Sequence, residues 1–312
     1  MLMKVVISNM TMNTKQLSIS NIAWDAKDDL KVAKILNKHD VKYIDLAPSK
    51  YFKDFKKATI TEIEQVKGIW RKHGISIYGM QSLMFGTKDL NLFGDNLVQS
   101  IMLDHLSSVC RIGNLLDARY LVFGSPKNRD CSVVEDDNRE GIALDFFYRL
   151  GEIAKHYNVT ICLEPNPELY GANFLTTTQD TYDFVCKLNH PNIRMQLDTG
   201  TMLVNNEVAS VIEHVKDMIG HVHLSQNHLT VLGDSCEDIP NTAINTADNV
   251  LNNFLSSKLS CIEDEHKCLS EALNKTETKI YTIEMLTNKE KEPLKAIDRA
   301  ISFASRVYLN QN

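Results

Sequence analysis

Four residues that could bind a metal ion each lie near the end of a different apolar run. They close the segments ICLE, RMQLD, IGHVH and TIE, and they are Glu164, Asp198, His223 and Glu284. Carboxylate and imidazole groups are the usual ligands of Mn²⁺, Mg²⁺, Co²⁺ and Zn²⁺ in proteins. The pattern predicts one divalent-metal site assembled from four distant parts of the chain, and it does not choose among these ions.

Each of these residues, taken singly, also fits an ordinary structural role. Glu164 precedes Pro165 and fits a loop cap, and Asp198 in Asp-Thr-Gly fits a turn. His223 fits a buried core histidine, and Glu284 fits a partner of a lysine. A carboxylate at the end of an apolar strand is costly to bury unless a cation or another partner compensates it. Because three carboxylates share this setting, a metal site accounts for the set better than four separate structural roles.

Short apolar runs alternate with amphipathic stretches along the chain and would bring these four residues together. The runs predict eight strands: Leu17–Ala23, Tyr43–Ala47, Ser76–Met80, Tyr120–Gly124, Thr160–Glu164, Arg194–Asp198, His221–Leu224 and Ile280–Met285. Strands that alternate with helices favour a parallel sheet, and eight such strands close a barrel. The fold predicted is therefore a (β/α)8 TIM barrel, in which the C-terminal ends of the strands share one face.

Three of the intervening helices have recognisable starts. Thr61 and Glu64 have the spacing of a capping box, and the helix that they open would end at Gly74. A second helix is predicted from about Asn96 to Leu116, with His105 as a structural residue. A third begins after Thr177 or Thr178 as its N-cap.

Length and composition indicate one large domain over residues 1–312. The chain is 43% hydrophobic and has no stretch rich in Gly, Ser and Pro that would separate two cores. Residues 1–15 precede the first strand and are predicted to be an N-terminal extension. Residues 226–278 are long for one connection, contain the tract NTAINTADNVLNN, and are predicted to hold an insertion or a lid near the site.

The charge pattern and the cysteines narrow the class of partner. The net charge is −6 with no long basic run, so a nucleic-acid groove is not favoured and a small polar molecule fits better. The seven cysteines are scattered with no Cys-x-x-Cys pair, which indicates reduced thiols and a cytoplasmic location. No apolar run has the length of a signal segment or a membrane span, so no membrane partner is expected.

Several of these segments, taken in order, resemble a known family. ISNIAWD, YIDLAPSKYF, LVFGSPKNRD, ICLEPNP, MQLDTG, GHVHLS and TIEM are similar to the sugar phosphate isomerase/epimerase group of the xylose-isomerase-like barrels, relatives of D-tagatose 3-epimerase and of endonuclease IV. The similarity runs from Leu17 to the C-terminal helix, except for the long interval after the seventh strand. It implies that Glu164, Asp198, His223 and Glu284 hold the metal. His221 points the same way as His223 by strand alternation and is the alternative ligand.

The resemblance also implies a reaction on a small carbohydrate. The two glutamates, Glu164 and Glu284, would lie on opposite faces of the sugar, and one would remove and the other return a proton next to a carbonyl through a cis-enediolate. The metal would act as a Lewis acid on the substrate oxygen. Homo-oligomers are plausible by the same analogy.

Other polar residues near strand ends are candidates for contact with substrate. Lys127 and Arg129 would bind an anionic group such as phosphate, or lie in a solvated loop. Trp24 fits either a sugar platform or a packing residue. His228 fits a site residue or an exposed loop side chain. The full set of predicted substrate-binding residues is Asn21, Trp24, Asp45, Gln81, Lys127, Arg129, Asn166, Gln196 and His221.

Three positions depart from the family pattern. Thr201 stands where the epimerases commonly have a histidine, Leu229 where the ketose epimerases have a substrate-binding arginine, and Asp45 where a glutamate is frequent. Free ketohexose is therefore a weak guess for the substrate.

Three alternative classes share the predicted barrel. A dehydratase or lyase acting on a related polyol would need only a suitable acid beside the same carbonyl chemistry. An endonuclease-IV-like repair enzyme needs extra histidines where this chain has Asp45, Gln81, Ser125 and Thr201, and is less favoured. A non-catalytic metal- or sugar-binding barrel is opposed by the two glutamates. Neither a Gly-x-Gly-x-x-Gly nor a Gly-Lys-Ser/Thr segment is present, which gives nucleotide binding no support.

Overall fold

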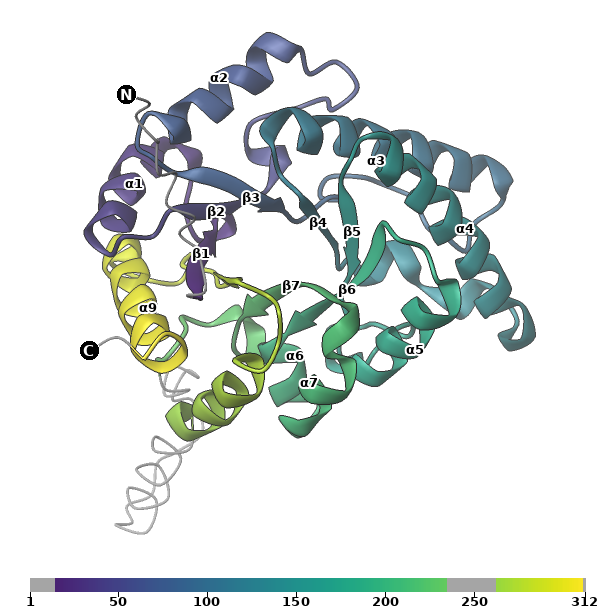
Figure 1. Ribbon diagram of the computed structural model, residues 1–312. Helices are drawn as coiled ribbons and strands as arrows, with labels where there is room; N and C mark the ends of the chain where they lie inside the picture. The colour runs from purple at the N-terminus through teal and green to yellow at the C-terminus, as the bar shows by residue number, and fades with distance from the viewer. Residues whose placement is uncertain (1–14, 235–261, 311–312) are drawn as a thin grey trace, which may run out of the picture.

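Eight parallel strands form a closed barrel in the computed structural model, which describes residues 15–234 and 262–310 (Figure 1). Each strand pairs with the next along the chain, and β8 pairs with β1, so the predicted (β/α)8 fold is confirmed. The strands are β1 (Gln16–Ser20), β2 (Tyr43–Leu46), β3 (Ser76–Met80), β4 (Tyr120–Phe123), β5 (Thr160–Leu163), β6 (Ile193–Asp198), β7 (Ile219–Leu224) and β8 (Ile280–Ile283).

Helices surround the barrel on its outside (Figure 1). They are α1 (Asp29–Lys38), α2 (Ile60–Arg71), α3 (Asn96–Leu116), α4 (Asp136–His156), α5 (Thr178–Leu188), α6 (Thr199–Val204), α7 (Ser210–Val215), a helix over 262–273, and α9 (Pro293–Tyr308). Short 3-10 helices are η1 (Asn21–Ala23), η2 (Ala26–Asp28), η3 (Pro48–Lys50), η4 (Pro126–Arg129), η5 (Cys131–Val133), η6 (Glu168–Tyr170), η7 (Lys216–Met218) and η8 (Asn227–Leu229).

Several predicted boundaries are wrong by a few residues, and two of these differences have clear local reasons. The first strand was expected to reach Ala23, but it ends at Ser20, whose hydroxyl accepts a hydrogen bond from the amide of Ile22 and starts η1. The capping box of α2 is formed by Thr59 and Glu62, not by Thr61 and Glu64. The sequence TITEIE contains the Thr-x-x-Glu spacing twice, so spacing alone could not choose between them.

The other helix starts agree with the sequence. α3 spans the predicted Asn96–Leu116, and the N-cap of α5 is Thr177, whose hydroxyl accepts from the amide of Asp180. His105 lies on α3, where its Nε2 is 2.9 Å from the backbone oxygen of Leu83, in keeping with the structural role predicted for it.

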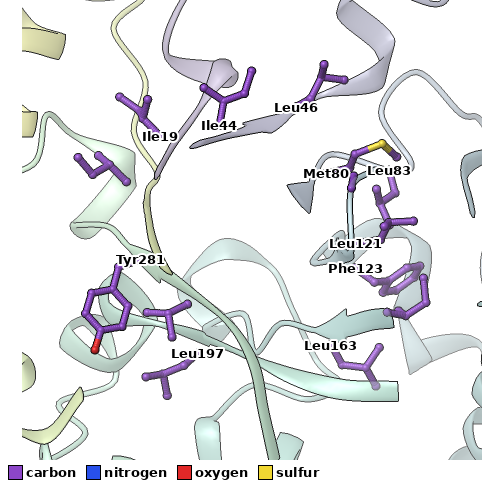
Figure 2. Close-up of a cluster of buried hydrophobic side chains, with 14 of the residues drawn as sticks. Ile19, Ile44, Leu46, Met80, Leu83, Leu121, Phe123, Leu163, Leu197 and Tyr281 are labelled. Atoms are coloured by element: carbon purple, nitrogen blue, oxygen red, sulfur yellow. The ribbon is translucent and has the colours of Figure 1, made fainter. Parts of the chain in front are cut away.

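The apolar core lies between the barrel and its helices. Figure 2 shows part of it, with side chains from successive strands such as Ile19, Ile44, Leu121 and Leu163. Several strand residues of the other parity are buried and polar; Ser18, Asp45, His221 and Thr282 are 0% exposed. TIM-barrel interiors are usually filled by branched apolar residues, so this polar interior indicates that the barrel supports a polar site at its end.

Most of the predicted N-terminal extension and about half of the predicted insertion lie outside the described residues. Residues 1–14 and 235–261 are not described, so the N-terminal extension and the lid remain predictions. The helix over 262–273 packs beside α9, where the Ser270 hydroxyl donates to the Val307 carbonyl at 2.9 Å. This end of the predicted insertion therefore belongs to the layer of helices around the barrel. Within the described residues, no helix is both long and apolar enough to span a membrane.

Candidate metal centre

The four predicted metal ligands meet at the C-terminal end of the barrel. Glu164 and Glu284 directly follow β5 and β8, Asp198 ends β6, and His223 lies in β7. One ligand atom from each residue lies within 4.8 Å of all the others. Asp198, His223 and Glu284 are buried, and Glu164 is partly buried. Four adjacent strands thus bring together residues that are up to 120 positions apart in the sequence, from 164 to 284.

His223 lies between the two glutamates. Its Nδ1 atom is 3.0 Å from Oε1 of Glu164 and 3.1 Å from Oε2 of Glu284. Asp198 is fixed from the other side, because its Oδ1 accepts from the amide of Thr201 at 2.6 Å and its Oδ2 accepts from the Ser225 hydroxyl at 2.7 Å. Asp198 is therefore oriented in the way expected for a preorganised ligand.

The electrostatics of this group fit a divalent cation. Burial, together with the neighbouring carboxylates of Glu164 and Glu284, raises the pKa of Asp198 to about 7. Burial alone would lower the pKa of His223, but Glu284, Asp45 and Glu164 together raise it well above its ordinary value. Three buried carboxylates repel one another unless positive charge lies among them. Three carboxylates and one imidazole are also a suitable donor set for Mn²⁺, Mg²⁺, Co²⁺ or Zn²⁺.

A glycine makes room for one of these carboxylates. A Cβ atom at Gly124, the residue after β4, would lie 1.9 Å from Oε2 of Glu164. No side chain larger than hydrogen can stand there unless the carboxylate moves. The same holds more weakly for Gly79 on β3, whose Cβ would lie 2.8 Å from Oδ1 of Asp45.

A second buried cluster joins His223 to the polar interior. Oδ2 of Asp45 is 2.9 Å from Nε2 of His221 and 3.7 Å from Nε2 of His223. Burial opposes ionisation of Asp45, but the two histidines outweigh it and hold the pKa of Asp45 below its usual range. One ligand atom from each of these three residues also lies within 4.8 Å of the others, so they form a second possible metal site. His221 thus pairs with Asp45 and is not grouped with Glu164, Asp198 and Glu284, as an alternative ligand would be.

A cavity of about 800 Å³ opens beside the four-residue cluster. Glu164, Asp198 and Glu284 line it, together with residues that follow β3, β4 and β5. Of the predicted substrate-binding residues, Gln81, Lys127 and Asn166 line this cavity. The amide of Gln81 donates to Oε1 of Glu284, and that of Asn166 lies 3.5 Å from Oε2 of Glu164.

The remaining predicted substrate-binding residues do not line the cavity, and they are Asn21, Trp24, Asp45, Arg129, Gln196 and His221. Asn21 holds the segment after β2 in place, because its Oδ1 accepts from the amide of Ala47 and its Nδ2 donates to the Tyr51 hydroxyl. Trp24 is a packing residue, because its indole donates to Asp29 and its ring contacts Trp70 edge-on. Neither side chain lines the cavity, and a role for either in substrate contact stays a prediction.

Two further predictions depend on residues now seen to be buried. Arg129 is 1% exposed, and its guanidinium finds no hydrogen-bond acceptor among the described residues. Burial lowers its pKa to about 10, against the opposing effect of Glu164. Arg129 and the exposed Lys127 therefore do not form a shared anion site on the cavity wall. Gln196 is fully buried, with its amide facing His221 and His223.

Some cavity residues had no signal in the sequence. Tyr170 and most of the loop from Ser82 to Asn91 line the cavity. Leu229 lines it too, although only the absence of a family arginine had singled out that position. Thr201 lines it as well, although only the absence of a family histidine drew attention to that position. His228 is exposed, and its ring lies beside Tyr170 without lining the cavity.

Comparison with known proteins identifies the family. A sequence model described as the xylose isomerase-like TIM barrel matches residues 33–241. The chain belongs to this family. No curated protein gives a significant match to the sequence.

Solved structures of two sugar epimerases and of one zinc-binding protein share the fold at low identity. A D-psicose 3-epimerase from Clostridium cellulolyticum, solved with D-tagatose, has a TM-score of 0.70 and 15% identity, with 94% of this chain and 99% of that chain covered. An L-ribulose 3-epimerase has a TM-score of 0.69 and 14% identity, with 95% of both chains covered. The IOLI protein, solved with a bound zinc atom, has a TM-score of 0.61 and 16% identity over 95% of this chain and 97% of that chain.

Proposed function

We propose that this protein is a divalent-metal-dependent isomerase or epimerase of a sugar or sugar phosphate. The observation that carries the proposal is the placement of Glu164 and Glu284 in one buried group, on either side of Nδ1 of His223 and both on the wall of the same cavity. Two carboxylates held at one cavity can act as proton acceptor and proton donor on a bound substrate. The sugar epimerases with the same fold support this choice of reaction.

Glu164, Asp198, His223 and Glu284 are the residues that would hold the ion. When bound, a divalent ion supplies Lewis-acid stabilisation of negative charge on a substrate oxygen. The mutual repulsion of the three carboxylates, expressed in the raised pKa of Asp198, is the property of this site that such an ion would relieve.

The two glutamates would share the proton transfer. One glutamate, as a carboxylate, would remove a proton from a carbon next to a carbonyl, and the other, as a carboxylic acid, would give its own proton to the opposite face of the same carbon for epimerisation. For isomerisation the proton would go to the former carbonyl carbon, while the hydroxyl proton of the carbon that lost its hydrogen passes to the former carbonyl oxygen. A base must be ionised, and although burial opposes this, His223 and Gln81 lower the pKa of Glu284. Gln81 and Asn166 would orient the carboxylates and contact substrate hydroxyls, because both line the cavity beside them.

Exchange of substrate hydrogen with deuterated water tests the proposal without assuming the product. A panel of ketoses, aldoses and their phosphates should include a sugar that gains deuterium at a carbon next to its carbonyl. Glu164→Gln and Glu284→Gln should each lower this exchange by at least about a hundredfold, the usual scale for loss of a general base. Glu168→Gln, a change at an exposed residue of η6, should retain it.

Treatment with a chelator should also abolish exchange, and added Mn²⁺ or Zn²⁺ should restore it. Undiminished exchange in both glutamine variants would remove the two glutamates from the reaction. Full exchange in the chelated protein would remove the metal from the proposal.

A further inference from the structure

The cavity has a buried end and an exposed end. At the buried end lie Glu284, Asp198 and Gln81, which are 8%, 5% and 4% exposed. At the exposed end lie Phe85, which is 73% exposed, and the exposed residues Asp89 and Lys127. A molecule that reacts at the buried end can therefore extend outward past these side chains.

The volume of the cavity exceeds what one sugar ring needs. Sites for drug-sized ligands span about 300–1,000 Å³, and this cavity, at about 800 Å³, lies in the upper part of that range. A monosaccharide is smaller than such ligands. Space remains for a second unit once a single ring is placed against Glu164 and Glu284.

The wall at the exposed end of the cavity, which we call the outer wall, is held in place by hydrogen bonds and by core packing. The loop between β3 and α3, residues 81–95, is longer than most connections of this kind. It is tied down by Asn128, whose Nδ2 donates to the Leu90 carbonyl at 2.6 Å and whose carbonyl accepts from the amide of Leu92 at 2.9 Å. Leu83 anchors the loop in the core cluster shown in Figure 2. The exposed ring of Phe85 therefore projects from a fixed support.

The chemistry of the outer wall suits a sugar ring better than a phosphate. Phe85, Leu229 and Tyr170 provide apolar surface, and the Tyr170 hydroxyl is already bonded to Asn227, which leaves its ring for contact. Thr87 and Asn91 lie on the same wall; their side chains already donate to the carbonyls of Met84 and Asp130, which leaves the Thr87 oxygen as an acceptor and the second amide hydrogen of Asn91 as a donor. Rings with apolar faces and hydroxyl edges are bound by such mixtures.

The charges of the wall agree with a neutral unit. Lys127 is the one Lys or Arg among the described residues that line the cavity, and the acidic Asp89 lines the same wall. Arg129, the other cation of this segment, is buried and does not line the cavity.

We propose that the natural substrate is a two-ring carbohydrate. Its reacting sugar lies against the acidic cluster, and its second, glycosidically linked sugar lies against Phe85, Leu229 and Tyr170. This inference rests on the proposed function, which supplies the orientation of the reacting sugar.

Isothermal titration calorimetry on the metal-loaded protein tests the inference with matched pairs of sugars. The pairs are fructose with lactulose and glucose with cellobiose, and fructose 6-phosphate is the anionic comparison. In at least one pair the two-ring sugar should bind about tenfold more tightly or better, the gain expected from burying one more ring face. Phe85→Ala should reduce this ratio several-fold, and Leu229→Ala should reduce it in the same direction.

Leu97→Ala is the matched control, because Leu97 is 68% exposed on α3 and does not line the cavity. It should leave the ratio of affinities as in the unchanged protein. Equal affinity within both pairs, a ratio that survives both Phe85→Ala and Leu229→Ala, or tightest binding of fructose 6-phosphate would each overturn the inference.

Deuterium exchange on the same sugars separates the two proposals. Exchange with one-ring and two-ring sugars alike, without a difference in affinity, would reject the second sugar site and leave the isomerase proposal standing. A clear preference for two-ring sugars with no exchange on any sugar of the wider panel would reject the isomerase proposal and leave the outer binding site.

Discussion

Asp198 is the residue whose protonation most directly controls the proposed metal site. Its pKa is raised to about 7 by burial and by Glu164 and Glu284, so in the metal-free protein it holds a proton below pH 7. A metal ion must displace that proton, because carboxylate ligands bind in the ionised form. The raised pKa of His223 acts in the same direction.

Metal affinity should therefore rise with pH. Between pH 6 and pH 8 the affinity for Mn²⁺ should increase by about tenfold or more, since each proton released on binding contributes up to tenfold per pH unit below the pKa. Titration calorimetry in two buffers of different ionisation enthalpy would measure both affinity and proton release. Equal affinity at both pH values, with no proton released, would mean that Asp198 and His223 are not displaced by the ion.

At the scale of secondary-structure elements, the approach of β4 to β5 leaves space for the Glu164 carboxylate. Gly124→Ala would place a methyl group where Oε2 of Glu164 lies. We expect this variant to fold but to bind Mn²⁺ at least about tenfold more weakly, because the displaced carboxylate loses its ligand position. Gly141→Ala on α4 is the control, because nothing lies within 4 Å of its added Cβ. Unaltered metal affinity in Gly124→Ala would show that this carboxylate is not a ligand.

The start of α2 gives a test of the fold itself. Thr59→Ala removes the hydroxyl that accepts from the amide of Glu62 and should lower the free energy of unfolding by about 1 kcal/mol. Thr61→Ala lies inside the helix and should have no effect or a small stabilising one. Chemical denaturation measures both changes, and a larger loss in the Thr61 variant would move the cap to the position that was first expected.

The sequence predicted the elements and the convergence of the four candidate ligands because each is encoded locally. Every ligand ends an apolar run, and parallel strands place such ends on one face. The lining of the cavity was not encoded in this way. Arg129 turns inward within η4, and Ser82 and Asp89 adopt left-handed backbone conformations in a loop without periodicity. His221 and His223 point the same way by strand alternation, so the sequence did not distinguish their partners. In the structure Asp45 contacts His221, whereas Glu164 contacts His223.

For the whole molecule, the proposed ion would link four strands, β5 to β8, that enter the barrel at widely separated points of the chain. A ligand that binds only the folded state stabilises it in proportion to the logarithm of its concentration over its dissociation constant. Mn²⁺ or Zn²⁺ added to the metal-free protein should therefore relieve the repulsion of the three carboxylates and raise the free energy of unfolding of the whole barrel. The two ligand clusters share His223, so the number of bound ions distinguishes the four-residue site from an additional site at Asp45.

The most direct measurement is the number of divalent ions bound per chain, determined by equilibrium dialysis with elemental analysis. Our account predicts one tightly bound ion in the chelated and reloaded protein. Asp198→Asn should abolish tight binding, whereas Asp183→Asn, a change at an exposed residue of α5, should leave it intact. No tightly bound ion, or one that is retained in full by Asp198→Asn, would contradict the central claim that these four side chains form a metal site.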